Sequence, residues 1–439
     1  TATFTNLNLT IASGVTKVLT LRGGISSSAN VGDVYKFYVS TVTSADITAY
    51  DADGNSASLT GTAANKTGTV VVQVADVGDL SVVKAADDTD SEAGILVAGG
   101  ERILGKFRFT ATNEDMTLNK MRILVTDSDS ATATSTIVAA TAPTLKLYDG
   151  STQVGSVSGY NVDASGDNSG VAVIEALGWI VPKDTSKTLT VKAVLNTIAA
   201  GAVSGKNLYV SIMGTSGTTY EAQGATGKDN SLTAATGNLK IVYKTKPTIT
   251  VASAGGTLTA STPVMRFTVS ADSAEQVSWK KIQLSVAVTN ASVTAVTAAP
   301  ATTGNVYIKD ISSGDYLSIA TAYSHTSSSS APTTNVITGG STGYVTLMLT
   351  TEQQIAAGGS KTYEVTLPFS DISATAGAAT AVVRLHRQET TAVSASTYTV
   401  IEASDAAGVM NGSPSFIWSD NSVVGHGLTT GDWANGVYV

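Results

Sequence analysis

The chain has no cysteine, so it can form neither disulfides nor sites that depend on a thiolate. Charged residues make up only 14% of its 439 residues, and aromatic residues only 6%. No apolar run reaches the roughly 18 residues that a membrane-spanning helix needs, and no signal peptide is visible. The net charge of −8 comes without a basic patch, so nucleic acid has no electrostatic reason to bind.

In place of charges the chain has threonine, serine, glycine and alanine. β-Branched Thr and Val favour pleated sheets, whereas Gly, Ser, Asn and Asp favour turns, so this mixture predicts an all-β protein with many loops. The composition is typical of prokaryotic surface proteins, which are stable outside the cell without cross-links. We therefore expect an extracellular or cell-surface protein. Because the chain begins at Thr1 rather than Met, we also expect that an N-terminal piece has been removed.

One five-residue signature occurs three times, and each copy begins a strand-like run with alternating apolar residues. The copies are Lys17-Val18-Leu19-Thr20-Leu21, Lys187-Thr188-Leu189-Thr190-Val191 and Lys361-Thr362-Tyr363-Glu364-Val365. Their lysines are 170 and 174 residues apart (187 less 17, and 361 less 187). A period of that length corresponds to a whole domain rather than to a solenoid repeat.

Further strand patterns repeat in the same order around the second and third signatures. Alternating faces without crossover helices predict tandem immunoglobulin-like antiparallel β-sandwich modules. We place the modules at 79–240 and 241–410, after a first unit at 1–78 and before a C-terminal tail at 411–439. Trp279 aligns with Leu118 across the repeat, which predicts a core position for the tryptophan. Only Glu352 to Ala357 reads as helical, for about one turn.

The first unit lacks counterparts of the strands that precede the signature in the other modules. Its opening alternates through Phe4, Leu7, Leu9 and Ile11, and it would be an incomplete sandwich with unpaired strand edges. Three explanations stay open: a cleaved segment remains associated, the unit is a small domain resting on the second module, or strands of a neighbouring subunit complete it.

The tail supplies candidate donor residues for such a completion. These are Phe416, Ile417, Trp418, Trp433, Val437 and Tyr438. Together with Phe4, Leu7 and Leu9 as acceptor residues, they would form an assembly interface between copies of the chain. A donor at one end and an acceptor at the other make a head-to-tail contact, which builds a layer or a filament unless it closes into a ring.

The tail also carries a family resemblance. Its motifs are Ser415-Phe416-Ile417-Trp418-Ser419-Asp420 and Thr430-Gly431-Asp432-Trp433-Ala434-Asn435-Gly436. They resemble a tail of S-layer-like surface proteins of ultra-small candidate-phyla (Patescibacteria) bacteria, and the rest of the chain is similar to such proteins in composition and module plan. The resemblance implies a secreted structural or adhesive coat protein. Such tails usually continue past the Asn-Gly motif, whereas this sequence stops at Val439, so we expect processing at this end too.

Patterns for catalysis are scarce in the sequence. It contains three histidines, and neither a Gly-x-Ser-x-Gly elbow nor a His-Glu-x-x-His motif occurs. We expect His386 at a surface position of a strand and His325 and His426 in Ser/Gly loops. Carboxylates are paired only within loop clusters, so we predict that the protein is not an enzyme.

Calcium is the metal ion that the acidic loops would suit, because closely spaced oxygen ligands favour it. The candidate ligands are Asp51, Asp53 and Asn55 in one loop and Asp87, Asp88, Asp90 and Glu92 in another. The same residue types also build turns and keep loops solvated, and at any single site we favour that explanation. No other cofactor is indicated.

Sugars could be attached to the chain or bound by it. The glycosylation sequons are at Asn8, Asn65, Asn290 and Asn411. The four tryptophans, Trp179, Trp279, Trp418 and Trp433, could stack on sugars, but we expect Trp279 in a core and the two tail tryptophans in an interface.

We therefore predict an extracellular structural protein that assembles head-to-tail with copies of itself by strand complementation. The alternative is a cell-surface adhesin or carbohydrate-binding stalk with glycan partners, which an exposed aromatic platform would favour. A noncatalytic fragment of a larger surface enzyme is a third, more remote option.

Overall fold

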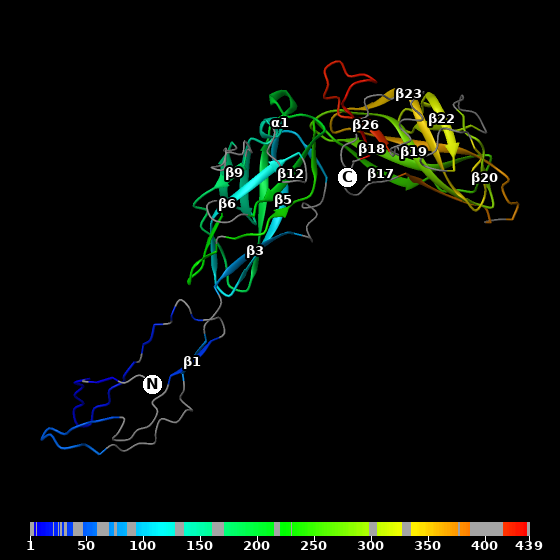
Figure 1. The fold of residues 1–439 in the computed structure, drawn as a ribbon. Helices are drawn as coiled ribbons and strands as arrows, with labels where there is room; N and C mark the ends of the chain where they lie inside the picture. Colours follow the sequence, from blue (N-terminus) through cyan, green and yellow to red (C-terminus); the bar gives the residue numbers. More distant parts are fainter. Residues whose placement is uncertain are drawn as a thin grey trace. The chain divides into compact units, whose positions relative to one another are not determined.

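In a computed structural model, the chain divides after Val77 into two compact units, Thr1–Val77 and Gly78–Val439, and each is described here by itself (Figure 1). The structure describes residues 4–5, 7–20, 22–24, 26, 29, 33–37, 47–58, 70–73, 77–85, 94–127, 136–159, 171–214, 220–229, 231–297, 305–326, 335–375, 378–386 and 416–436. The larger unit contains both predicted modules, and antiparallel sheets make up almost all of its described secondary structure. The predicted all-β, immunoglobulin-like sandwich class is confirmed.

The second module is a sandwich of two sheets around one core. One sheet has the order β3 (Asp79–Lys84), β5 (Gly100–Thr112), β11 (Ser186–Leu195), β7 (Thr144–Asp149), β8 (Thr152–Ser158). The other has the order β14 (Lys228–Asp229), β13 (Glu221–Gln223), β6 (Met116–Thr126), β12 (Lys206–Ile212), β16 (Lys240–Tyr243), β4 (Gly94–Val97), with β9 (Val171–Ile174) and β10 (Trp179–Val181) on β6 and β15 (Ala235–Thr236) on β12. The described helical segments are short: α1 (Thr136–Thr141) and a 3-10 turn at Ile198–Ala200.

The third module repeats this plan. One sheet joins β17 (Pro247–Ser253), β18 (Ser261–Ala271), β24 (Ser360–Ser370), β20 (Ser292–Val293) and β21 (Tyr307–Asp310). The other has the order β22 (Ile319–His325), β23 (Thr342–Ile355), β19 (Val277–Thr289), β26 (Phe416–Ser419), β27 (Trp433–Asn435), with β25 (Thr380–Leu385) also on β19.

Strand β16 serves the cores of both modules, because successive side chains of a strand point to opposite faces. Val242 belongs to the core of the second module, whereas Ile241 and Tyr243 belong to that of the third. β16 also forms the one parallel pairing among the described strands, with β4. The boundary that we expected at residue 240 therefore falls inside a strand that the two modules share.

Two expectations about single elements have different outcomes. Trp279 is fully buried in the core of the third module, as its alignment with Leu118 predicted. The helical turn expected from Glu352 is wrong, because these residues end β23 and pair with β19. Pairing along an existing strand outweighs a weak local helix preference.

In the first unit the described strands are β1 (Val34–Phe37) and β2 (Val70–Gln73), which pair antiparallel. In this pairing Phe37 lies opposite Val70.

Candidate assembly site

In both complete modules the signature strand is paired along both of its edges. In the second module β11 pairs with β5 and β7, and Leu189 lies opposite Phe107. In the third module β24 pairs with β18 and β21, and Tyr363 lies opposite Phe267. Leu189 and Tyr363 are both 0% exposed. Burial raises the pKa of the Tyr363 hydroxyl to about 12.

In the first unit the same signature is not covered. Residues 17–20 are not part of a strand, and Val18 and Leu19 are 88% and 68% exposed. Leu19 is the counterpart of Leu189 and Tyr363. Leu21 and Ile25, which continue the predicted apolar face, lie outside the described residues.

The other predicted acceptor residues of this unit are exposed as well. Phe4, Leu7, Leu9 and Ile11 all have large exposed side chains, although their alternation predicts a half-buried strand. An alternating sequence forms a stable strand only when a second layer covers one of its faces. The first unit thus carries a row of apolar side chains that the rest of the described unit does not bury.

The predicted donor segment forms a hairpin, β26 with β27, and this hairpin lies in the sheet of its own chain. β26 pairs with β19, so that Trp418 lies opposite Trp279. Phe416, Ile417 and Trp418 are fully buried, and Trp433 is only 1% exposed. The indole nitrogen of Trp418 donates to the carbonyl oxygen of Gly436 at 2.7 Å. Val437 and Tyr438 lie outside the described residues.

The hairpin has a counterpart in the second module. β13 pairs with β6 so that Ala222 lies opposite Leu118, the residue that corresponds to Trp279. Both pairings contain a register shift at the same place, and β14 extends β13 as β27 extends β26. Residues 416–435 are therefore the closing hairpin of the third module rather than a segment beyond it, and donation to a neighbouring subunit stays a prediction.

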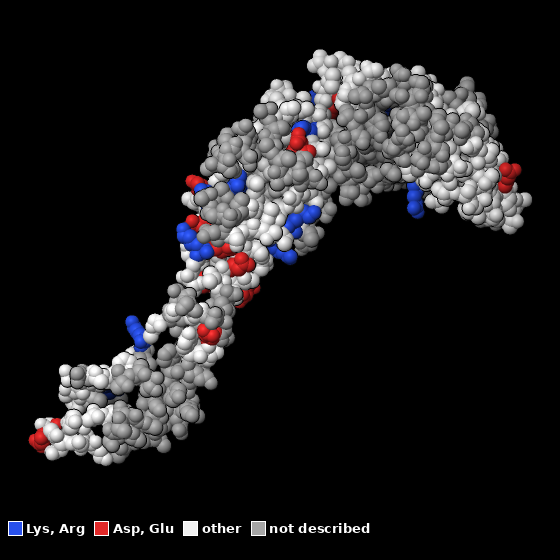
Figure 2. All heavy atoms as spheres, in the orientation of Figure 1, with Lys and Arg blue, Asp and Glu red and all other residues white. Residues whose placement is uncertain are grey.

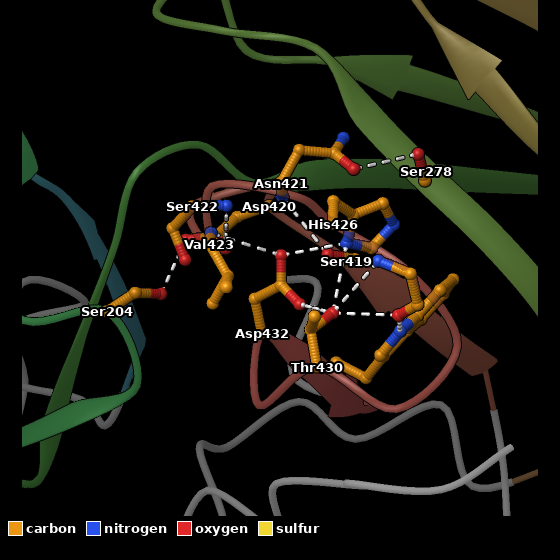
Figure 3. Close-up of polar contacts among 12 residues, drawn as sticks. Ser204, Ser278, Ser419, Asp420, Asn421, Ser422, Val423, His426, Thr430 and Asp432 are labelled. Carbon is orange, nitrogen blue, oxygen red and sulfur yellow. Dashed lines mark hydrogen bonds and ion pairs between the residues drawn. The ribbon is translucent and has the colours of Figure 1, made fainter.

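A histidine held by two carboxylates fixes the loop of the hairpin, as Figure 3 shows in part. His426 Nδ1 lies 2.9 Å from Asp432 Oδ2, and His426 Nε2 lies 2.9 Å from Glu352 Oε2 on β23. Both contacts are hydrogen bonds only when both ring nitrogens carry protons, which is the cationic form. We call His426, Glu352 and Asp432 the clasp. Since each ring nitrogen has a carboxylate partner, the clasp joins the loop of the hairpin to β23.

The charge of Asp432 is stabilised by its hydrogen bonds. Burial by itself would raise the pKa of this carboxyl, but the Thr430 hydroxyl, the nearby His426 and the Val423 amide outweigh burial, so the pKa is lowered. The Thr430 hydroxyl donates to Asp432 Oδ1 at 2.5 Å. The Trp433 indole donates to the Gly427 carbonyl and closes the same loop.

Asp420 ties the hairpin to the joint between the two modules (Figure 3). Its Oδ2 accepts hydrogen bonds from the Ser204 hydroxyl at 2.5 Å and from the Lys244 amide at 2.7 Å. Ser204 precedes β12 of the second module, and Lys244 follows β16. Burial, only partly offset by these hydrogen bonds, raises the pKa of Asp420. The Tyr243 and Trp418 rings pack at the same joint, 4.9 Å apart.

The histidines lie elsewhere than their sequence context predicts. His325 ends β22 and is fully buried, with its ring stacked on Tyr344, so the expected Ser/Gly loop position is wrong. His386 follows β25 and is half-buried against the edge of the same Tyr344 ring. His426 is in a loop as expected, but its two carboxylate partners were not anticipated.

The first candidate calcium loop has the contacts of a turn. Asp51 accepts hydrogen bonds from the amides of Asp53 and Asn55, at 3.0 and 2.8 Å, and Asn55 lies beside the bridge from Tyr50 to Ser56. The hydrogen bond from the Asn55 amide lowers the pKa of Asp51 most. Among the described residues no group of three or more Asp, Glu or His side chains is arranged around a metal site. Asp87, Asp88, Asp90 and Glu92 lie outside those residues.

The sequons are placed as follows. Asn8 is exposed in the first unit. Asn290 is exposed at the turn after β19, where its side-chain amide donates to the Ala378 carbonyl at 3.0 Å. Asn65 and Asn411 lie outside the described residues.

Charged side chains of both signs are interspersed on the face in Figure 2, without a broad field of one sign over the residues described there. No helix in the described part of the chain is long and apolar enough to cross a membrane.

Comparisons with known proteins give matches among solved structures. No family model and no curated protein matches the chain. Among solved structures, it is similar to a chaperone–tip adhesion subunit complex of Csu pili from Acinetobacter baumannii, with 10% identity over 67% of this chain and 98% of that chain and a TM-score of 0.16. The serine-rich repeat adhesion glycoprotein Srr1 of Streptococcus agalactiae matches with 9% identity over 70% and 94%, at a TM-score of 0.16. The CupB6 tip adhesin of Pseudomonas aeruginosa matches with 8% identity over 70% and 96%, also at 0.16. At these values the likenesses carry no argument about function.

Proposed function

We propose that this chain is a noncatalytic structural protein of the cell exterior, which assembles with copies of itself into a surface layer or filament by β-strand addition at the first unit. One observation carries the proposal: the third residue of the signature is fully buried in two modules, as Leu189 and Tyr363, whereas its counterpart Leu19 is exposed in the first unit. An exposed apolar strand sequence is a ready site for pairing with another chain.

The complete modules indicate what the added strand supplies. The neighbours of the signature strand, β5 and β18, share Arg-Phe-Thr at residues 108–110 and 266–268. Their aromatic side chains lie in the same cores as Leu189 and Tyr363. A partner strand with apolar residues at alternate positions would place apolar side chains beside Leu19 in the same way.

The cell exterior is proposed from the composition and from the resemblance of the tail to S-layer-like proteins. A chain without cysteine is stable there only when its cores suffice, and both modules have large apolar cores. Calcium among the acidic clusters of the chain and glycans on the sequons would fit the same proposal. They would stiffen and cover an extracellular array.

An adhesin or carbohydrate-binding stalk remains the alternative, but it gains no support from the tryptophans. All four are buried, with at most 4% of any of them exposed, so none offers a platform for sugar stacking. Assembly therefore stays the function that we propose.

The proposal is tested by electron microscopy and light scattering of the whole chain, of Leu19→Asp and of Val424→Asp. Val424 is 100% exposed and belongs to a loop of the hairpin, so it serves as the matched control. We expect assemblies from the unsubstituted chain and from the control, and their loss in Leu19→Asp. Three preparations that behave alike would overturn the proposal.

A further inference from the structure

The connection to the closing hairpin differs greatly between the two modules. Residues 213–220 link β12 to β13 in the second module, which is eight residues. Residues 386–415 link β25 to β26 in the third module, which is 30 residues. At roughly 3.3 Å per extended residue, the longer connection has a maximum reach of about 100 Å. The connection therefore contains enough residues for the hairpin of the third module to reach a second copy of the chain.

The site that receives the hairpin is made by residues that precede the connection. β19 supplies the pairing edge, Glu352 on β23 supplies one side of the clasp, and Ser204 and Lys244 supply the donors to Asp420. The backbone pairing of β26 with β19 is the same whether the two strands belong to one chain or to two copies of it. A hairpin from a second copy would find the same register, the same clasp and the same buried pocket for Trp418.

From this comparison we propose that β26–β27 is an exchangeable element, which docks on β19 of a second copy of the chain in the register that it has on its own β19. Exchange of an identical element adds a contact between copies without needing a new interface. Reciprocal exchange closes a dimer, whereas serial exchange gives an open row of subunits. This inference adds a defined contact to the proposed function. It rests on that function only in assuming that copies of the chain associate.

The contacts also explain why a copy of the same chain is the partner. β26 is the counterpart of β13, which pairs with a β6-type strand, whereas the signature strand pairs with β5- and β7-type strands. The hairpin therefore fits β19 and not the exposed signature at residues 17–21. The aromatic contact with Tyr243 and the carboxylate contact with Ser204 select this site further.

The absence of cysteine allows a direct test with introduced thiols. Ser278 and Ser419 are register partners on β19 and β26, and both are fully buried. Directly opposed residues of antiparallel strands have Cα atoms about 4.5–5.5 Å apart, which a disulfide can bridge. We expect the double variant Ser278→Cys with Ser419→Cys to form the bond within one chain or between two, which establishes that the pair is close enough.

The decisive sample mixes the two single variants, Ser278→Cys and Ser419→Cys, unfolds and refolds them together at high concentration, and oxidises the product. A disulfide-linked dimer of the two variants forms only if the hairpin of one chain lies on β19 of the other. Ser313→Cys, at an exposed turn, replaces Ser419→Cys in the matched control and should give no dimer. No dimer in the main mixture, when the double variant bonds, would overturn the proposal.

Two further samples make the result independent of the cysteines and of the first unit. Deleting residues 389–410 leaves a connection of eight residues, as in the second module, and should lower the dimer yield at least tenfold. An unchanged yield would overturn the proposal. In chains carrying Leu19→Asp, size-exclusion chromatography with light scattering should still show dimers for the long connection and monomers for the short one. Monomers for both connections would contradict exchange. Loss of layers or filaments in Leu19→Asp, with the dimers kept, concerns only the proposed function.

Discussion

The signature strand in the complete modules and the same sequence in the first unit differ in their surroundings rather than in their pattern. Leu189 and Tyr363 are buried because flanking strands pair with their own strands and a second sheet packs over the face on which they lie. Leu19 has the same alternation around it and remains largely exposed. Alternation therefore specifies which face of a strand can be buried, and the sheet that packs on this face decides whether it is buried.

The largest loss of stability is expected when the third module loses its closing hairpin. Removing residues 416–439 exposes the edge of β19 and takes away Phe416, Ile417 and Trp418, each of which contributes about 1.5–3 kcal/mol by burial. We expect a lower unfolding midpoint, dye binding to apolar surface and a red shift of the fluorescence from Trp279. A chain that ends at Gly436 keeps the described contacts and serves as the control. Identical melting of the two shortened chains would show that the hairpin does not close the module.

The comparison is sharpened by the same substitution in two copies of the signature. Leu189→Ala removes a fully buried side chain and should destabilise the larger unit by about 2–5 kcal/mol. Leu19→Ala changes an exposed side chain and should change stability by no more than about 0.5 kcal/mol. Urea unfolding measures both. A large loss from Leu19→Ala would mean that a core, and not solvent, surrounds this residue.

Much of the fold followed from the sequence because strands have a period of two and the modules repeat. The burial of Trp279 could be predicted by aligning it with Leu118, and the apolar face of β11 from Leu189 and Val191. The closing hairpin could not be assigned in the same way. Phe416-Ile417-Trp418 has little in common with Glu221-Ala222-Gln223, and its connection is far longer, so the shared pairing is visible only in the register.

The clasp could not be predicted for a related reason. Glu352 is 74 residues from His426 in the sequence, and its surroundings suggested a helical turn rather than the end of β23. A motif search finds groups with fixed spacing, whereas these residues meet only after β26 has paired with β19.

A smaller effect tests whether the first unit accepts the strand that the repeat indicates. A synthetic peptide with the sequence of Gly100–Thr112 should pair with residues 17–21 as β5 pairs with β11. At a concentration about ten times its Kd, the peptide should slow amide hydrogen exchange in this segment about tenfold. The control peptide carries Phe107→Asp and Phe109→Asp, which removes its apolar face. Equal protection by both peptides would speak against pairing in this register.

The smallest effect concerns the pH dependence of the contacts that complete the third module. Asp420 has a raised pKa in the folded protein, so its contribution to stability is full below the unfolded value of 3.8 and is lost as the pH rises through the folded value. Asp432 has a lowered pKa, so its contribution is present above 3.8 and is lost as the pH falls through the folded value.

The variants Asp420→Asn and Asp432→Asn should therefore change the stability profile in opposite directions. Relative to the unsubstituted chain, the Asp420→Asn variant becomes more stable as the pH rises from about 4 to 7, because a buried carboxylate no longer has to ionise there. The Asp432→Asn variant becomes less stable, relative to the unsubstituted chain, as the pH rises through the range in which carboxyl groups ionise. The reason is that it lacks a charge that Thr430 and His426 stabilise. Unfolding midpoints at a series of pH values separate the two. If the two variants had the same pH profile, the pKa values of Asp420 and Asp432 would not be shifted in opposite directions in the folded protein.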